Sequence, residues 1–203
     1  MAVDSKKIII GAPDQATTGA VAYADVGTAL PTTAIASLDP SKWADTGYVS
    51  EDGVTLTPNY NTNDIKDWSK GAVRTLLNEF TGEVKFAFIQ TDYDSLVAIF
   101  GEDSVSKTAA DANHGEQISV KMGARMAPAK AWCFSMKDGD NRARIVLPNA
   151  QPVVDGDLTF VANEPIKWAV SLKCNADENG DNIIIMTDDG KTTSTTTTTT
   201  TGA

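Results

Sequence analysis

The sequence predicts a mostly β fold, a two-sheet β-sandwich with one flanking α-helix and long loops or arms. Short stretches of alternating apolar and polar residues recur through the second half of the chain. Turn dipeptides such as Asp138-Gly139, Asp155-Gly156 and Asn179-Gly180 separate these stretches. Residues 93–100 have helical periodicity instead. Many short strands with one helix are typical of a sandwich or barrel.

The helix has recognisable ends. Asp92 stands where an N-cap belongs, because its carboxylate can accept a hydrogen bond from the first turn. Gly101 stands just beyond the last apolar residue, where glycine ends many helices. Between them lies one apolar stripe, which we expect to cover a sheet, formed by Tyr93, Leu96, Val97 and Phe100.

Strands are expected where the alternation is regular. A first run covers residues 54–57, and Pro58 is expected to break it. Residues 73–80 and 83–90 are expected to pair as a hairpin about Thr81-Gly82. The later strands are expected over residues 118–122, 130–136, 141–150, 158–161, 166–173 and 182–187.

The length of 203 residues fits one domain with extensions. An N-terminal arm is expected over residues 1–30, where glycine and proline repeatedly interrupt the pattern. The β-sandwich domain is expected over residues 31–187, including a long loop at 40–70. Residues 102–117 are polar and predict a mobile loop. Residues 188–203 are rich in threonine and predict a flexible tail.

The charge and the apolar runs exclude some classes of protein. The net charge is −10, from 17 Lys and Arg against 27 Asp and Glu. This argues against a protein that grips nucleic acid by its phosphates, although nucleic acid can slide past an acidic wall. No run is long enough for a membrane span or a signal-peptide core, so we expect no membrane binding and a cytoplasmic site of synthesis. Cys133 and Cys174 are expected as buried free thiols.

The sequence offers little for catalysis or metal binding. His114 is the one histidine and lies in polar sequence without a nucleophile near it, so a general-base role is disfavoured. Residues 175–180 look like the start of an EF-hand loop, but the twelfth position is Met186 rather than glutamate, which favours a turn. We therefore predict no catalytic, cofactor or metal site; a small hydrolase using His114 is the enzyme alternative.

Four aromatic residues fall in polar, turn-rich sequence: Trp43, Tyr48, Tyr60 and Trp68. They can staple long loops onto the core, since an amphipathic ring gains by burial. They can equally anchor an interface between subunits, where tryptophan and tyrosine are enriched. Both interpretations stay open, and these four residues are the candidate interface residues.

The chain resembles the major tail tube proteins of long, non-contractile-tailed phages, especially those that infect actinobacteria. The resemblance is carried by GYVSEDGV from Gly47, TPNYNTNDIKDW from Thr57, VRTLLNEFTGEVKFAFIQT from Val73 and YDSLVAIFG from Tyr93. It continues more loosely to about residue 187.

The resemblance implies a ring-forming tail-tube fold. Six copies would close into a ring by joining inner sheets into one barrel, and rings would stack into a hollow tube. The arm at 1–30, the loop at about 40–70 and the segment after residue 187 would bridge successive rings. The implied partners are the chain itself, the tape-measure protein, and tail terminator and tail-tip proteins, with DNA only in passage. The implied location is the virion tail, assembled in the host cytoplasm.

Two alternatives remain beside this one. A β-sandwich on the virion can bind a receptor or carbohydrate, because exposed aromatic rings stack on sugars. A tube protein of a contractile tail or of a secretion apparatus would have the same general sequence character. In any tube, acidic charge facing the bore would let DNA pass through repulsion over a Debye length of about 8–10 Å.

Overall fold

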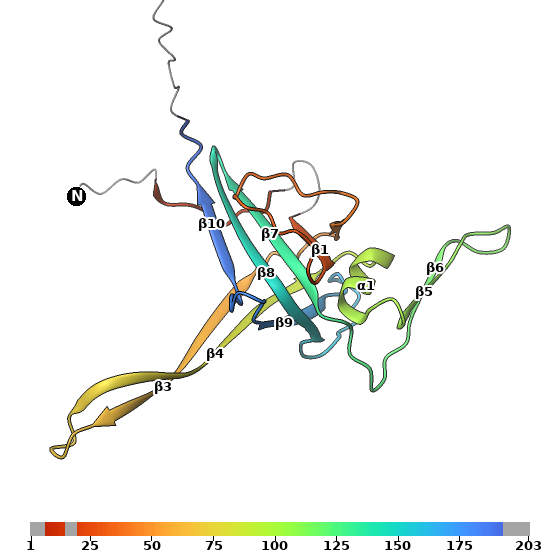
Figure 1. Cartoon of the computed structure of the whole chain (residues 1–203). Coiled ribbons are helices and arrows are strands. Elements are labelled where there is room, and N and C mark those ends of the chain that lie inside the picture. The colour runs from red at the N-terminus through yellow and green to blue at the C-terminus, as the bar shows by residue number, and fades with distance from the viewer. Residues whose placement is uncertain (1–6, 15–19, 193–203) are drawn as a thin grey trace, which may run out of the picture.

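The computed structural model describes residues 7–14 and 20–192, and its architecture is the predicted mostly β fold with a helix at its side (Figure 1). The strands are β1 (Val21–Asp25), β2 (Ala44–Asp45), β3 (Thr55–Lys66), β4 (Ala72–Phe88), β5 (Val105–Thr108), β6 (Gln117–Val120), β7 (Lys130–Asp138), β8 (Asn141–Val154), β9 (Trp168–Asn175) and β10 (Ile184–Asp188). The helix is α1 (Tyr93–Phe100).

One sheet supplies both layers of the sandwich. Its strand order is β2-β1-β7-β8-β9-β4-β3, with β10 pairing with β8 off this path. Residues 142–146 of β8 pair with β10, whereas residues 149–154 pair with β9. The long strand β8 therefore passes from one layer into the other, and β5 and β6 form a separate two-stranded sheet.

The main core lies between the layers. Phe86 of β4 faces β7, with its ring centroid 5.9 Å from that of Trp132 and 5.3 Å from that of Phe134. The buried residues of α1 join this cluster, and Phe100 meets Trp168 edge-on at 6.0 Å. The expected helix caps are present, since Asp92 accepts a hydrogen bond from the backbone N–H of Ser95 at 2.9 Å and Gly101 has φ 80°.

A second, smaller core closes the outer face of the layer that contains β1, β7 and β10. Trp43, which is only 4% exposed, packs there with Leu30 and Leu38 over small and aliphatic residues of the strands. Arg144 of β8 fixes the covering segment, because its Nη1 donates to the carbonyl oxygens of Thr33 and Ala36 at 3.1 and 2.7 Å. Residues 26–43 therefore shield this face from solvent.

The structure corrects the predicted hairpin about Thr81-Gly82. β4 runs through both residues without a turn, and the chain reverses at residues 67–71 instead. Glycine at position 82 allows close packing, since a Cβ there would lie 2.6 Å from Ile183 Cδ1, the end of a side chain that would have to shift, and 3.1 Å from Cys174 Cβ. Pro58 does not break β3, because β3 is an edge strand and its proline needs no partner on the open side.

Three further expectations about local structure were wrong. The loop predicted at 102–117 contains β5 and part of β6, which pair with each other. The strand predicted at 158–161 is absent, and Phe160 in that segment is 67% exposed. Much of the loop predicted at 40–70 is strand β3.

The terminal segments are only partly described. Within the predicted arm at 1–30, residues 21–25 form β1, which pairs with β7. Most of the threonine-rich tail lies outside the described residues. Cys133 and Cys174 are free and buried, as predicted.

Trp43→Ala tests the second core. Because the indole is almost fully buried, its removal should lower the free energy of unfolding by about 3–5 kcal/mol, measured by urea denaturation. The exposed Ser37→Ala serves as the control and should change it by less than about 0.5 kcal/mol. A Trp43→Ala protein as stable as wild type would contradict the packing described.

Acid should destabilise the fold. Hydrogen bonds hold the carboxyl pKa below its ordinary value at Asp39, Asp52, Asp67, Glu83, Asp177 and Asp189. Burial raises the pKa of Asp45, which acts in the opposite sense. A lowered native pKa gives stability that is present above the unfolded-state pKa of about 4 and is lost as pH falls through the native pKa. The urea concentration at the midpoint of unfolding should therefore decrease as the pH is lowered from 6 to 3. An unchanged midpoint would contradict this.

Candidate assembly interface

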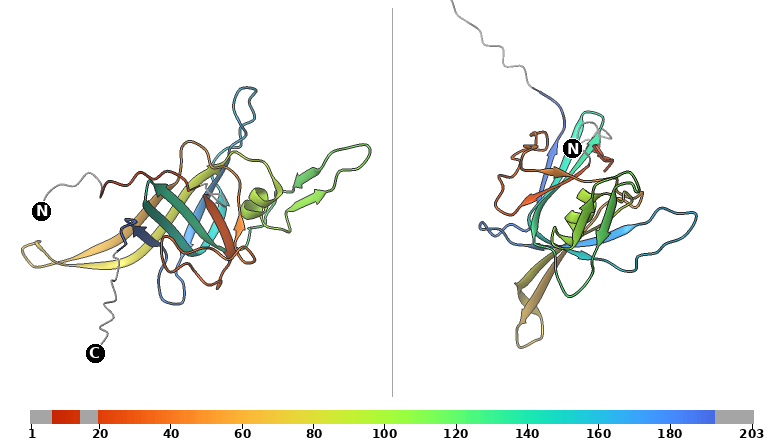
Figure 2. Two further views of the ribbon diagram at one scale, coloured as in Figure 1. Left: turned by 90° about the horizontal axis from the view of Figure 1, so that it is seen from above. Right: turned by 90° about the vertical axis from the view of Figure 1, so that its right-hand side faces the viewer.

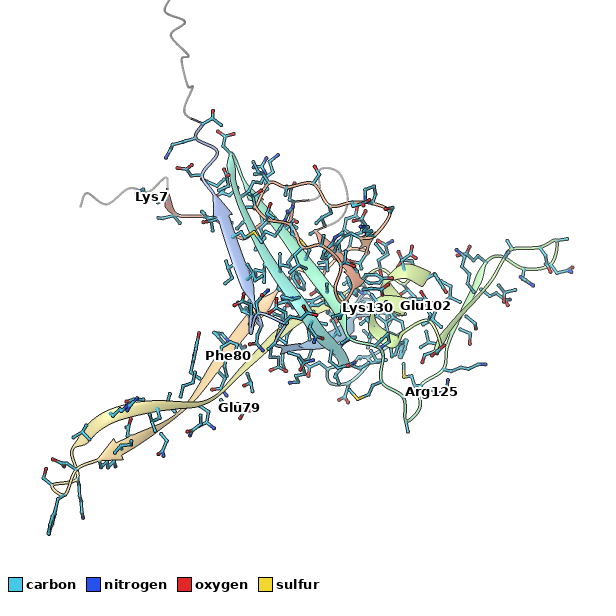
Figure 3. The ribbon with its side chains drawn as sticks, in the orientation of Figure 1. Lys7, Glu79, Phe80, Glu102, Arg125 and Lys130 are labelled. Carbon is cyan, nitrogen blue, oxygen red and sulfur yellow. The ribbon has the colours of Figure 1, made fainter. Side chains whose placement is uncertain are left out.

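The hairpin of β3 and β4 extends out of the body of the protein. Residues 82, 84, 86 and 88 of β4 are buried and alternate with partly exposed ones, as expected for a strand over a core. From residue 72 to 81 that alternation disappears, and residues 57–66 of β3 are all exposed. Figure 3 labels Phe80 and Glu79 close to the point where the hairpin leaves the body. Both faces of the outer hairpin are therefore open to solvent.

This hairpin carries an unusual number of exposed apolar side chains, which we call the hairpin patch: Tyr60, Ile65, Trp68, Val73 and Leu77. Trp68 is the extreme case, with its full surface exposed (102%). A two-stranded hairpin is at best marginally stable alone in water. Clustered exposed apolar residues mark surfaces that meet another protein.

The tip of the hairpin is ordered by Asp67. Its Oδ1 accepts from the Ser69 hydroxyl at 2.8 Å and from the Gly71 backbone N–H at 2.9 Å. These bonds hold the pKa of the Asp67 carboxyl below its ordinary value. The backbone N–H of Asp67 in turn donates to the Gly71 carbonyl at 2.9 Å, and Lys70 has φ 66°. Trp68 is thus presented on a defined turn.

Further contacts stiffen the hairpin between tip and body. The Thr75 hydroxyl donates to the Asp64 carboxylate at 2.7 Å across the two strands. The rings of Tyr60 and Phe80 lie with their centroids 4.8 Å apart. Paired residues of this kind are what stabilise an antiparallel ladder.

The four candidate aromatic residues occupy three different places. Tyr60 and Trp68 lie on the hairpin, and Trp43 is in the second core. Tyr48 is 61% exposed and lines a cavity of about 560 Å³ between residues 46–54, the start of β1 and the end of β7. Within the protomer Trp43 holds a loop against the core, whereas the three other rings are exposed to solvent.

Sequence reasoning did not single out Ile65, Val73 and Leu77, which share the hairpin with Tyr60 and Trp68. The available signal was the stretch Asp67-Trp-Ser-Lys-Gly71, a turn sequence flanked by apolar residues on both sides. Because the hairpin turn was predicted at Thr81-Gly82, this turn signal at residues 67–71 was not recognised.

The described residues contain no group of His, Cys, Asp and Glu arranged to hold a metal ion. His114 lies in an exposed loop, where its Nε2 is 3.1 Å from Asp111 and its Nδ1 is 2.9 Å from the Gly115 carbonyl oxygen. Among the residues that the structure describes, no helix is long and apolar enough to cross a membrane.

A mostly β protomer with an ordered, apolar, projecting hairpin defines a class of subunits built to associate with other proteins. Comparison with known protein families agrees with this class: the family model described as "Phage tail tube protein" matches residues 1–197. The chain belongs to the phage tail tube proteins, a family of structural subunits of the virion tail. Among the curated proteins compared, none matches the sequence.

Asp67→Ala tests the order of the tip. The change removes the carboxylate that accepts from Ser69 and Gly71, so amide hydrogen exchange of Lys70 and Gly71 should accelerate by about tenfold or more. The strands over the core should keep their protection, because they do not depend on the tip. Unchanged exchange at residues 70 and 71 would show that the carboxylate does not order the turn.

Proposed function

We propose that the chain assembles into hexameric rings that stack into a hollow tail tube, which surrounds the tape-measure protein and conducts DNA. The observation that carries this proposal is the hairpin patch, a set of apolar side chains on a projecting hairpin that the body of the protomer leaves exposed. Assembly takes place in the host cytoplasm, and tail terminator and tail-tip proteins cap the two ends of the tube.

The direction of the hairpin favours stacking. Figures 1 and 2 show the β3–β4 hairpin and the smaller β5–β6 hairpin extending toward opposite sides of the body. A projection on one side that meets a different surface of the next copy makes a heterologous contact. Such contacts build rings when they close and filaments when they do not. The hairpin of one ring is proposed to lie on the neighbouring ring and to bury the hairpin patch there.

Open sheet edges favour ring closure. β3 and β2 end the main strand order, and β10 pairs with β8 alone. Unpaired edges readily add a strand from another chain. On this proposal, edges of neighbouring copies meet within the ring. The part of the expected arm at 1–30 that precedes β1 and the segment after residue 187 act as further bridges.

Tyr48, Tyr60 and Trp68 are proposed to anchor contacts between subunits. Tyr60 and Trp68 do so from the projecting hairpin, and Tyr48 does so beside the concave surface of the body. Trp43 contributes indirectly, since it holds the covering segment of residues 26–43 in place. Large rings in desolvated pockets carry a disproportionate share of binding energy.

Truncation of Trp68 tests the proposal. Trp68→Ala should leave the urea midpoint unchanged, because the indole makes no buried contact in the protomer, but should abolish tube growth in negative-stain electron micrographs. The loss of about 2 kcal/mol or more per contact, repeated around each ring, is enough to prevent stacking.

Phe160→Ala is the matched control, since Phe160 is also an exposed aromatic residue but lies outside the hairpin. It should form tubes. Normal tubes from Trp68→Ala would contradict the assigned role of the hairpin tip, and failure of wild type to form tubes even with tail-tip proteins present would contradict tube formation.

A further inference from the structure

We propose that Asn179 is a site of spontaneous deamidation, and that the carboxylate of Asp177 restrains this reaction in the folded protein. The reaction needs only water besides the chain itself. This inference concerns the turn between β9 and β10 and is independent of the proposed assembly. It gives a role to residues 175–180, which look like the start of an EF-hand loop but do not complete one.

The sequence makes Asn179 the most susceptible asparagine of the chain. Deamidation begins when the backbone nitrogen of the next residue attacks the side-chain amide carbon, and a side chain on that next residue obstructs the approach. Asn179 is the one asparagine that glycine follows, since each of the others precedes a residue with a side chain. Glycine also gives the backbone the conformational freedom that the attack requires. Asparagine is among the thermolabile residues of proteins, and this position exposes it most.

The site is open to solvent in the folded protein. Asn179 and Gly180 are both exposed, in the turn that joins β9 to β10 (Figure 1). A Cβ built on Gly180 would meet no neighbouring atom of the described residues within 4 Å. Gly180 has φ 88°, a conformation that favours glycine. Water can therefore reach the reacting groups and any intermediate formed there.

The reaction consists of two balanced steps. Gly180 N forms a bond to Asn179 Cγ, the bond from Cγ to Nδ2 breaks, and the amide group leaves as ammonia with the proton that Gly180 N gives up. The product is a five-membered succinimide ring. Water then adds to one of the two ring carbonyls and opens the ring, to aspartate or to isoaspartate. Either product has a carboxylate in place of the neutral amide, and isoaspartate has one more carbon in its backbone.

The turn opposes the first step at both reacting groups. The backbone N–H of Gly180 donates to the Asp177 carbonyl oxygen at 3.1 Å, so the attacking nitrogen is engaged within the turn. The side-chain Nδ2 of Asn179 donates to Asp177 Oδ2 at 3.3 Å, which holds the amide beside that carboxylate. An amide that donates to a carboxylate is also less electrophilic at its carbon. Both contacts therefore oppose the approach of Gly180 N to Asn179 Cγ.

Asp177 organises this turn. Its Oδ1 accepts from the backbone N–H groups of Asn179 and Asp181 at 2.8 and 2.9 Å, and its own N–H donates to the Asp181 carbonyl oxygen at 3.0 Å. Side-chain bonds to nearby backbone groups are typical of aspartate in turns. These bonds, with the one from Asp181 as the largest cause, hold the pKa of the Asp177 carboxyl below its ordinary value. The restraining carboxylate is therefore ionised at neutral pH.

A covalent change in this turn would act on the base of the β3–β4 hairpin. Asn182 Nδ2 donates to the Cys174 carbonyl oxygen at 2.9 Å, and Ile183 packs beside Gly82 where β4 leaves the core. Isoaspartate at position 179 would lengthen the backbone just ahead of these contacts. Either product would also add a negative charge to a turn that is already acidic. Slow deamidation therefore preserves the packing beside Gly82.

Peptide mapping by mass spectrometry tests the proposal on the full chain. The protein is incubated in mildly alkaline buffer, with and without guanidinium chloride, and is then digested with pepsin at acidic pH, where the cyclisation is slow. The mass change from amide to carboxyl is followed at residue 179, with the other asparagines of the same sample as internal references. Asp177→Ala removes the restraining carboxylate. Asp189→Ala is the matched control, because Asp189 is also exposed and accepts from a backbone N–H, that of Lys191, at 3.1 Å.

In the unfolded chain Asn179 should deamidate faster than every other asparagine. In the folded wild type it should react about tenfold more slowly, the effect expected for hydrogen bonds to a charged group. Without denaturant, Asp177→Ala should approach the unfolded rate at this residue alone, and Asp189→Ala should match wild type.

Three results would overturn the inference. An unfolded chain in which Asn179 reacts no faster than the other asparagines would exclude the site. Equal rates at Asn179 in folded and unfolded wild type would exclude any restraint by the turn, whatever the variants do. A wild-type rate in Asp177→Ala would show that the carboxylate is not the restraint. Because the measurement needs no tubes, none of these results bears on the proposed function.

Discussion

The continuity of β4 is the constraint on which the rest of the structure depends. One strand of 17 residues is packed over the core at one end and exposed on both faces at the other. Its packed half carries Phe86 and Phe88 into the main core, so the projecting half is fixed in direction by the most buried part of the molecule. Where β4 leaves the core, Gly82 leaves room for the side chains of Ile183 and Cys174 to pack closely against the strand. The hairpin is therefore an extension of the fold rather than an appended loop.

The covered layer, the open layer and the projecting hairpin differ in the side chains that they expose. One layer is sealed by residues 26–43, held by the buried guanidinium of Arg144 and the indole of Trp43. The other layer presents charged side chains that pair with one another, and the projecting hairpin carries the exposed apolar side chains of the hairpin patch. On the proposed assembly, the apolar side chains of the hairpin become buried when the subunit meets another copy, which would link the fold of the protomer to tube formation.

The features that the sequence predicted correctly are local ones. The cap at Asp92, the glycine at 101 and the turn at Asp138-Gly139 each depend on residues within a few positions, and each is present. The turn predicted at Thr81-Gly82 was wrong because Gly82 packs against the side chains of residues 174 and 183. These residues are far away in the sequence, so no local pattern reveals the contact. Pro58 was misread because a proline is tolerated on an edge strand, and edge position is a property of the whole sheet. Burial likewise depends on the whole fold. The sequence therefore identified the aromatic residues as candidates but did not show that Trp43 is buried and Trp68 is exposed.

Helical reconstruction of tubes by electron cryomicroscopy tests the central claim most directly. The account predicts that the outer half of the β3–β4 hairpin lies against a subunit of the neighbouring ring, with Trp68 removed from solvent. It also predicts that the hairpin continues the direction of β4 over the core without bending at Gly82. A reconstruction in which the hairpin points into solvent, or folds back onto its own protomer, would contradict the account.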